Sequence, residues 1–417
     1  MKMLNKIQSV FLAILILLVW AGPDLSLGHA GNHPQRIILN LTETPYNSCA
    51  VTWRTSKLSE EPMGEIIPAA DLLDTSKTPE TCTAKSSVLI TGNQTSVYHY
   101  SVVFKGLKPG TLYACRVGSE HSWSPWSQFR TAVNRPESFS FVYFGDIQKG
   151  LFSMCPQVFQ AAFQKDPDAA FWLFIGDMVN NGEDDREWGD FFSALGWMSR
   201  TVPQVLTAGN HEYPDPRITP PEQHRITPFW RPQFTLPENG PQGLGETAYC
   251  FEYQGAFFVV LNGNEKIEEQ AAWMASCLSK NQLPWVIAAV HQPAYSISKH
   301  RDTKDYQKIF VPVFDRFSVD LVLQGHDHGY ARTAPLKHHK PVGDDEPGTI
   351  YLISNSGAKF YSVSSRYDHL MEKTMSRNIW FHTIQINRNT LSFKAYNVAK
   401  EMVDSFVIQK HMKSIKK

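Results

Sequence analysis

This sequence of 417 residues has no excess of positive or negative charge, because 40 lysines and arginines balance 40 aspartates and glutamates. Such a balance excludes the broad basic field with which many proteins attract nucleic acid, and no acidic tail suggests a partner of opposite charge. We therefore expect no nucleic-acid partner. Internal repeats and low-complexity tracts are also absent, which excludes a repeat architecture.

Long hydrophobic runs are absent beyond the first 30 residues. There, basic residues precede an apolar run at 10–21, and the small residues Gly28 and Ala30 occupy the −3 and −1 positions of a cleavage site before Gly31. This order is typical of a secretory signal peptide at residues 1–30. An uncleaved anchor is the alternative, but the run is short for a span of about 20 residues. We expect a secreted or periplasmic protein whose mature chain has no transmembrane segment.

Cysteine is scarce, which excludes a small disulfide-dense scaffold. An even number of cysteines in an exported chain permits disulfides, but the sequence alone leaves the pairs open. The six cysteines are Cys49, Cys82, Cys115, Cys155, Cys250 and Cys277.

The length of the chain favours two domains over one. In the first, residues 33–132, apolar and polar residues alternate in short segments at 47–53, 98–104 and 111–117. Short alternating strands separated by turn residues predict an all-β sandwich. Within it, residues 106–113 resemble the corner between two strands of a fibronectin type III domain.

After a linker at 131–137, the second domain, residues 138–410, alternates strands with helices. This alternation predicts an α/β layered domain, in which ligand sites lie at the carboxyl ends of the strands. The stretch 214–246 has no regular period and is predicted to be a loop over that site. Residues 411–417 are expected to form a basic, solvated tail. The expected strands include 139–144, 169–175, 203–207, 256–261, 285–290 and 319–323, and the expected helices are 155–164, 187–197, 268–278 and 306–317.

Five short motifs follow hydrophobic runs in this second domain, and together they supply two aspartates, an asparagine and three histidines. Imidazole and carboxylate suit zinc, iron and manganese, while the asparagine amide offers a neutral oxygen. Each motif alone could be an ordinary polar turn, but the ordered set favours a metal site. The motifs are Gly145-Asp146, Gly176-Asp177, Gly209-Asn210-His211-Glu212, Val290-His291 and Gly325-His326-Asp327-His328.

The order, spacing and context of these motifs resemble the calcineurin-like metallophosphoesterases, and within them the purple acid phosphatase branch. The resemblance extends from about residue 139 onward, and many members of that branch carry a fibronectin-like domain before the catalytic domain. It implies a catalytic sandwich of two mixed sheets flanked by helices. It also implies a centre of two metal ions, which activates water to hydrolyse a small phosphate ester.

The resemblance gives each candidate metal ligand a place in that centre. Asp177 would bridge the two metals. Asp146 and His328 would hold the first metal. The second metal would be completed by Asn210, His291 and His326.

Two positions depart from the family. The purple branch has a tyrosine three residues after its bridging aspartate, where this chain has Asn180, and the wider superfamily has a histidine where this chain has Gln148. Either amide could ligate the first metal through its oxygen, or water could take the place. Because a tyrosinate–iron bond colours the purple branch, we expect a colourless protein that uses divalent zinc, manganese or iron.

His211 and His300 are the candidate catalytic residues. His211 follows a candidate ligand and matches the family's histidine on the leaving-group side, from which it would donate a proton to the departing oxygen. His300 lies on the loop after His291, where relatives place a substrate-binding histidine. The alternative for His300 is an exposed loop residue without a role.

The sandwich resemblance also bears on two of the cysteines. Cys49 shares a strand face with Trp53, and Cys115 shares one with Tyr113. If the resemblance holds, the two strands face each other across the core, which predicts a disulfide between Cys49 and Cys115. Cys82 could compete for either partner.

Two other functions are compatible with the same motifs. A phosphodiesterase or nucleotide pyrophosphatase would use the same metal ligands and differ in the walls of the site. A surface-binding protein whose phosphoesterase domain has lost its activity is the alternative from another class. The complete ligand set argues against that loss.

Overall fold

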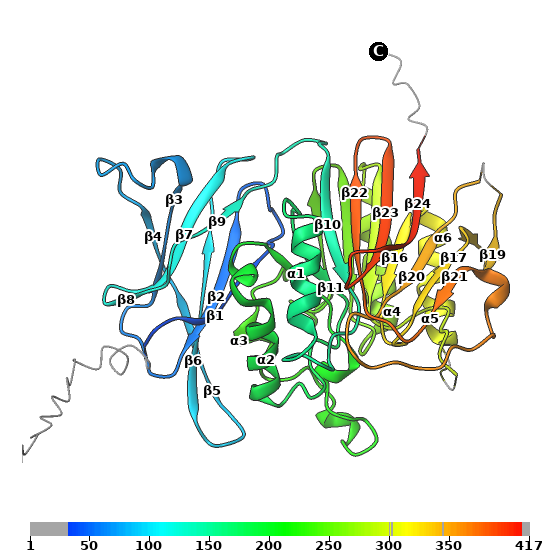
Figure 1. The fold of residues 1–417 in the computed structure, drawn as a ribbon, viewed down its shortest axis with the longest axis horizontal. Coiled ribbons are helices and arrows are strands. Elements are labelled where there is room, and N and C mark those ends of the chain that lie inside the picture. The colour runs from blue at the N-terminus through cyan, green and yellow to red at the C-terminus, as the bar shows by residue number, and fades with distance from the viewer. Residues whose placement is uncertain (1–31, 300, 302, 344–345, 411–417) are drawn as a thin grey trace, which may run out of the picture.

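The computed structural model describes the chain in four stretches, residues 32–299, 301, 303–343 and 346–410 (Figure 1). The predicted signal peptide at 1–30, the predicted tail at 411–417 and the candidate catalytic residue His300 lie outside the described residues. Within the described stretches, no helix combines the length and the apolar character needed to cross a membrane.

Two facing β-sheets form the N-terminal domain, as the alternating segments predict. Trp53 and Phe104 fill the core between the sheets. At the corner between β6 (Ser96–Phe104) and β7 (Leu112–Ser119), the Tyr113 hydroxyl accepts a hydrogen bond of 2.9 Å from the backbone N–H of Lys108. A tyrosine in this place is typical of immunoglobulin-like sandwiches. The other strands are β1 (Gln35–Asn40), β2 (Cys49–Thr55), β3 (Met63–Pro68), β4 (Glu80–Thr83), β5 (Lys85–Ile90), β8 (Ser122–Trp123) and β9 (Ser127–Arg130).

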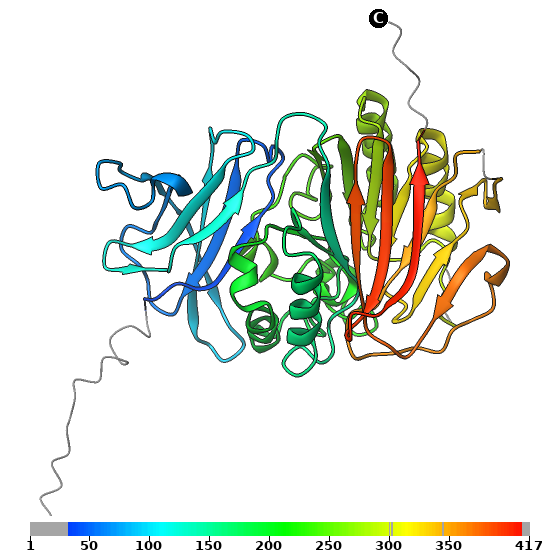
Figure 2. The same cartoon turned by 45° about the horizontal axis from the view of Figure 1, so that its top comes forward.

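The second domain is a sandwich of two mixed sheets with helices packed against them (Figure 2). The first sheet contains β10 (Phe139–Phe144), β11 (Trp172–Phe174), β12 (Gln204–Leu206), β22 (Trp380–Ile386), β23 (Thr390–Asn397) and β24 (Met402–Gln409). The second sheet contains β13 (Tyr249–Tyr253), β14 (Ala256–Leu261), β15 (Trp285–Val290), β16 (Leu321–Gln324), β17 (Tyr330–Thr333), β20 (Ile350–Ile353) and β21 (Met371–Met375). A separate hairpin joins β18 (Leu336–Lys337) and β19 (Lys340–Pro341).

The first sheet continues from one domain into the other. Strand β1 pairs in parallel with β12 through Asn40 and Gln204, and the Asn40 side-chain amide donates to the Gln204 carbonyl at 3.2 Å. One sheet of 10 strands therefore runs in the order β24-β23-β22-β10-β11-β12-β1-β2-β6-β5. The two domains are joined by backbone hydrogen bonds and not by a linker alone.

The central strands of the second sheet are buried on both faces, which explains their unbroken apolar sequences. In β14, Phe258 packs into the core between the two sheets, whereas its neighbour Phe257 packs on the opposite face, beneath helices α4 (Ile267–Lys280) and α6 (Val311–Phe317). Successive side chains of a strand point to opposite faces. Each strand therefore packs against a layer on both of its faces, and this packing fixes the position of the strand's carboxyl end.

Three of the four predicted helices are present with ends shifted by a few residues: α1 (Cys155–Lys165), α2 (Asp185–Leu195) and α4. The single helix predicted at 306–317 is wrong, because the chain forms two helices there, α5 (Lys304–Ile309) and α6. Pro312 accounts for the break. Proline has no backbone N–H to donate to the preceding turn, and its ring clashes with that turn.

The stretch 214–246 holds two short elements, η4 (Pro221–Gln223) and α3 (Trp230–Gln233). Trp230 is fully buried, and its indole N–H donates to the Glu246 carbonyl at 3.0 Å. Helix α3 packs against β2 and β6 of the N-terminal domain. Part of the stretch therefore packs on the N-terminal domain. The predicted cover over the site stays a prediction.

All six cysteines are free thiols in the structure. Cys49 and Cys115 come from the two facing sheets and share one core cluster, as expected. No disulfide joins them, so the predicted cross-link stays a prediction.

Candidate metal centre

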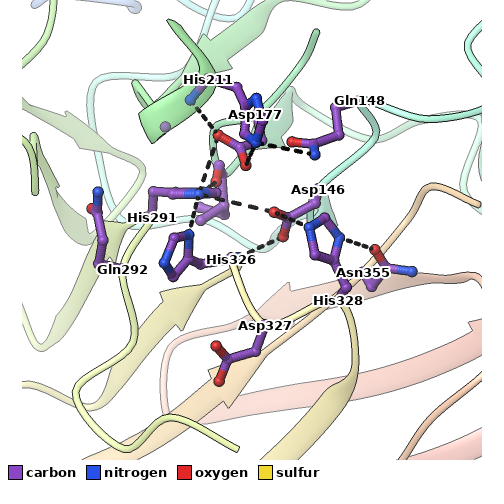
Figure 3. A network of polar contacts seen from close by, with 12 residues as sticks. Asp146, Gln148, Asp177, His211, His291, Gln292, His326, Asp327, His328 and Asn355 are labelled. Atoms are coloured by element: carbon purple, nitrogen blue, oxygen red, sulfur yellow. Dashed lines mark hydrogen bonds and ion pairs between the residues drawn. The ribbon is translucent and has the colours of Figure 1, made fainter. Parts of the chain in front are cut away.

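The five motifs meet at one edge of the catalytic sandwich, where strands of both sheets end (Figure 3). Strands β10, β11 and β12 run parallel, and so do β15 and β16. The turns after parallel strands lie at the same edge of a sheet. Asp146, Asp177 and Asn210 follow the first three strands, and His291, His326 and His328 follow the other two.

Two groups of potential ligand atoms form at this edge, and Asp177 belongs to both. One group is Asp146, Asp177 and His328, and the other is Asp177, His291 and His326. Within each group the ligand atoms lie within 4.8 Å of one another. A carboxylate shared by two adjacent groups has the position of a bridge between two cations.

Two of the histidines are held through one ring nitrogen, which leaves the other nitrogen directed at the carboxylates. The Nδ1 atom of His291 lies 2.6 Å from the Ile175 carbonyl oxygen, and that of His328 lies 3.2 Å from the Asn355 side-chain oxygen. Because both oxygens only accept, Nδ1 is the donor in each ring. In the neutral ring, Nε2 then carries the free lone pair, which is the arrangement that metal-binding histidines adopt.

Backbone strain accompanies this arrangement. Asp177, His326 and His328 have φ values of 51°, 72° and 47°, a left-handed region that non-glycine residues seldom adopt. Such strain costs on the order of 1–3 kcal/mol per residue and clusters at functional sites. Close packing adds to the constraint, because a Cβ atom at Gly209 would lie 2.3 Å from the Asp177 carboxylate.

The charges at this edge favour a cation between the two aspartates. Burial raises the pKa of Asp146 to about 7. Burial opposes ionisation of Asp177 as well, but the surrounding histidines, His291 foremost, together outweigh it and lower the pKa of Asp177. Burial likewise opposes protonation of His291, yet the carboxylates of Asp177 and Asp146 raise its pKa to about 9.

The donor atoms fit metal ions. Asp146 Oδ1 and Asn210 Oδ1 are buried and have no hydrogen-bond partner among the described residues, although an unpaired buried acceptor costs about 1–3 kcal/mol. Burial lowers the pKa of His326, and together with Lys359 it lowers that of His328 to about 3, so both rings are neutral. Neutral imidazoles, carboxylates and an amide oxygen are ligands that suit divalent zinc, manganese and iron.

Glu212 supports the site in a way that its place in a motif does not predict. Its fully buried carboxylate accepts backbone N–H bonds from Asp177, Met178 and Gly209, at 2.9, 2.8 and 2.7 Å. These bonds hold together the two turns that carry Asp177 and Asn210. In the sequence, only the place of Glu212 three residues after Gly209 could have pointed to this role. The fold shows which backbone amides the carboxylate binds.

Asp327 also supports the site from outside it. Its side chain points away from the ligand groups (Figure 3), and its carboxylate accepts bonds from the Ser296 hydroxyl and the Ile297 N–H at 3.0 and 2.6 Å. Arg301 lies 3.2 Å from the same carboxylate. Asp327 therefore fastens the loop after His291 to the turn that carries two candidate ligands.

His211 lies at the rim, with 28% of its side chain exposed. Its Nδ1 atom is 2.6 Å from the Asn180 carbonyl oxygen, so Nδ1 is the donor. Its Nε2 atom faces inward, 4.0 Å from Asp177 Oδ2. The role of proton donor expected of His211 stays a prediction.

Gln148 and Asn180, the two positions that depart from the family pattern, make different contacts near the site. When the Gln148 amide is oriented to suit both neighbours, its nitrogen donates to Asp177 Oδ2 and its oxygen accepts from Lys359 Nζ, each at 2.7 Å. Asn180 acts through its backbone carbonyl on His211. Lys359 was not singled out by any sequence motif.

Comparison with known proteins agrees with this geometry. Residues 34–131 match the family described as purple acid phosphatase, N-terminal domain, and residues 139–330 match the calcineurin-like phosphoesterase family. The two matches follow one another along the chain and correspond to the two domains of the fold.

Two curated relatives and one solved structure are similar to this chain. The chain is 25% identical over 379 residues to human acid phosphatase type 7, which covers 82% of each protein. It is 25% identical to purple acid phosphatase 15 of Arabidopsis thaliana, over 64% of this chain and 54% of the relative. The fold resembles that of the purple acid phosphatase PPD1 from yellow lupin (Lupinus luteus) seeds, with a TM-score of 0.75, 17% identity, and coverage of 91% of this chain and 75% of the lupin chain.

Proposed function

Because the chain joins a purple acid phosphatase N-terminal domain to a calcineurin-like phosphoesterase domain, we propose that it hydrolyses phosphate monoesters with two divalent metal ions. That it is a phosphoesterase of the purple acid phosphatase type follows from the family matches and from relatives such as human acid phosphatase type 7. The observation that carries the finer proposal is the carboxylate of Asp177, which two groups of ligand atoms share.

The proposal divides the ligands between two ions as the two groups suggest. When bound, the ions lower the pKa of water and offset the negative charge that develops on the phosphoryl oxygens. Asp177 is the proposed bridge between them. The first ion would be held with Asp146 and His328, and the second with Asn210, His291 and His326.

His211 is the proposed proton donor. Hydrolysis forms a bond from water oxygen to phosphorus and breaks the bond from phosphorus to the leaving group, whose oxygen takes up a proton. A protonated His211 can donate from Nε2, because its Nδ1–H is engaged by the Asn180 carbonyl. His300, proposed to bind substrate, lies outside the described residues.

The metal ions are proposed to be divalent and the protein colourless. Asn180 occupies the position of the purple branch's tyrosine, and its neutral amide lacks the phenolate that stabilises trivalent iron and absorbs visible light. An isolated, metal-loaded sample should show no phenolate–iron band. A visible absorption spectrum tests this directly, and such a band would contradict the assignment.

Export is part of the proposal and rests on the sequence of residues 1–30. An oxidising compartment would allow Cys49 and Cys115 to form the predicted disulfide, since both thiols lie in the core between facing sheets. Peptide mapping of the secreted, non-reduced protein should find this cross-link. Two free thiols there would contradict it.

The deciding experiment is an activity panel. Protein reconstituted with zinc, manganese or ferrous iron is assayed on a nitrophenyl phosphate monoester and on a bis-nitrophenyl phosphate diester. A higher kcat/KM on the monoester is expected. A preference for the diester would replace the proposal with a phosphodiesterase, and no hydrolysis with any metal would favour the surface-binding alternative.

A further inference from the structure

Two cysteines outside the metal centre face each other between strand β13 and helix α4. Strand β13 is the edge strand of the second sheet. In β13, Phe251 packs into the core between the two sheets, so its neighbour Cys250 points to the opposite face, where α4 packs. Cys277 of α4 packs against the same apolar cluster as Cys250, and both residues are half-buried. Both thiols are therefore within reach of a small molecule.

Asn239 fixes the strand and the helix relative to each other. Its side-chain amide donates to the Cys250 carbonyl at 2.9 Å and accepts from the Cys250 N–H at 3.0 Å. Its backbone carbonyl accepts the indole N–H of Trp273 at 3.0 Å. Trp273 lies four residues before Cys277 and therefore on the same face of α4. These bonds hold the two cysteines in place opposite each other.

The two thiols share a hydrogen bond, in which Cys250 donates to the sulfur of Cys277. This bond and the charge of Lys280 outweigh burial and lower the pKa of Cys277 from 9.0 to about 7. The same bond raises the pKa of Cys250, together with burial and the carboxylates of Glu43 and Glu252. Near neutral pH, Cys277 is therefore the thiolate of the pair, while Cys250 keeps its proton.

The other four cysteines lack this combination of contact, exposure and charge. Cys49, Cys115 and Cys155 are at most 3% exposed, and burial raises the pKa of each thiol. Cys82 is partly exposed, but burial raises its pKa as well. The thiolate, not the thiol, is the nucleophile in cysteine chemistry. Cys277 is therefore the most reactive cysteine of the chain.

We propose that Cys277 and Cys250 form a site of thiol–disulfide exchange, which closes a disulfide between α4 and β13 when the chain meets a small disulfide such as oxidised glutathione. The Cys277 thiolate attacks one sulfur of the small disulfide and displaces the other sulfur as a thiolate. Cys250 then gives up its proton and attacks the Cys277 sulfur, which displaces the second small thiolate. The protein thiols lose two electrons, which the small disulfide gains, and their protons end on the two small thiols.

Peptide mapping tests the exchange on the full chain. Reduced protein is incubated with oxidised glutathione near neutral pH and digested without reduction. Wild type should yield cross-linked fragments that contain Cys250 and Cys277 and have lost two hydrogen atoms. In Cys250→Ser the reaction should stop at glutathione bound to Cys277, because the second thiol is missing. The proposal is wrong if both wild-type cysteines stay free, or if glutathione stays on Cys277 in wild type as it does in the variant.

Alkylation with iodoacetamide separates a reactive thiolate from a thiol that is merely accessible. The rate at Cys277 should reach half its maximum near pH 7, and the rate at Cys82 at a higher pH. Cys250→Ala removes the donated hydrogen bond and should slow alkylation of Cys277 at neutral pH about threefold, since a more nucleophilic thiolate offsets part of the lost ionisation. An unchanged pH profile in this variant would contradict the assignment of Cys250 as the donor.

Cys82→Ser is the matched control. It removes a partly exposed thiol of the N-terminal domain and leaves the proposed pair in place. This variant should form the same cross-link at the wild-type rate, and loss of the cross-link would make Cys82 a partner and overturn the proposal. The exchange does not depend on metal ions, so the cross-link should also form in metal-free protein, whatever the outcome of the phosphatase assays.

Discussion

Asp177 is the residue on which the two-metal interpretation depends most, because both groups of ligand atoms include it. Asp177→Ala should remove metal from both positions, not from one position alone. Substituting a residue that only supports a metal ligand lowers activity roughly 10- to 100-fold, and the loss of activity in Asp177→Ala should be larger than that. Metal analysis beside activity is the measurement, with the exposed Asp168→Ala as control. Full metal content with intact activity would remove the two-metal reading.

His211 offers a second test at a single residue, since its Nε2 faces the site while Nδ1 is engaged. His211→Ala should slow hydrolysis most for substrates whose leaving group needs a proton, with losses approaching about 10²–10⁴-fold for alkoxide-like groups. Nitrophenyl phosphate, with its good leaving group, should suffer less.

The measurement is the rate loss of this variant across leaving groups of rising pKa at fixed metal content. Metal content should stay near wild type, because Asn210 is the proposed ligand of that motif. A loss independent of the leaving group would instead make His211 a phosphate-binding or structural residue.

At the scale of an element, strand β22 carries a titratable group into the core. His382 is fully buried, stacks on Phe393 with 5.2 Å between centroids, and its Nδ1 has no partner among the described residues. Burial lowers its pKa from 6.5 to about 3. The folded chain therefore keeps this ring neutral at pH values where the unfolded chain protonates it.

The sign of the pH effect follows from proton binding. Below pH 6.5 the unfolded state binds one proton more than the folded state, so stability falls by roughly 1.4 kcal/mol per pH unit down to about pH 3. His382→Phe should remove this contribution and make unfolding less dependent on pH between 6.5 and 5. Urea unfolding at several pH values measures it, with the exposed His121→Gln as control. An unchanged slope in His382→Phe would refute the assignment.

At the scale of the molecule, a cluster of charges clamps the N-terminal domain to helix α2. Asp185 accepts from Arg36 at 2.7 Å and from Arg54 at 2.9 Å, and both arginine side chains are at most 14% exposed. Burial opposes ionisation of Asp185, but the two guanidinium groups outweigh it and lower the pKa of its carboxyl. The clamp is therefore intact above the ordinary carboxyl pKa and is lost as the pH falls through the lowered value.

Asp185→Ala should destabilise the protein by roughly 2–4 kcal/mol, because it leaves two largely buried guanidinium groups without their carboxylate. The exposed pair of Asp215 and Arg217 provides the control, since solvent screens it and Asp215→Ala should cost much less than Asp185→Ala. Urea unfolding at pH 7 is the measurement. Equal midpoints for the two variants would show that the clamp contributes no stability.

The sequence by itself predicted the candidate ligand set and much of the layered architecture. Asp146, Asp177 and His291 each follow an apolar run, and a run that ends in a turn is a local pattern. Parallel strands bring such turns to one edge. The order of the motifs was therefore enough to predict that these side chains lie together, and the structure confirms that they do.

Only the tertiary structure decided the contacts between segments that are distant in the sequence. The pairing of β1 with β12, the bond of Lys359 to Gln148, and the packing of α3 on the N-terminal domain leave no periodic signal. The break at Pro312 shows that one residue can override a helical pattern. Long-range contacts depend on how whole layers pack, and that information is not contained in any local window of the chain.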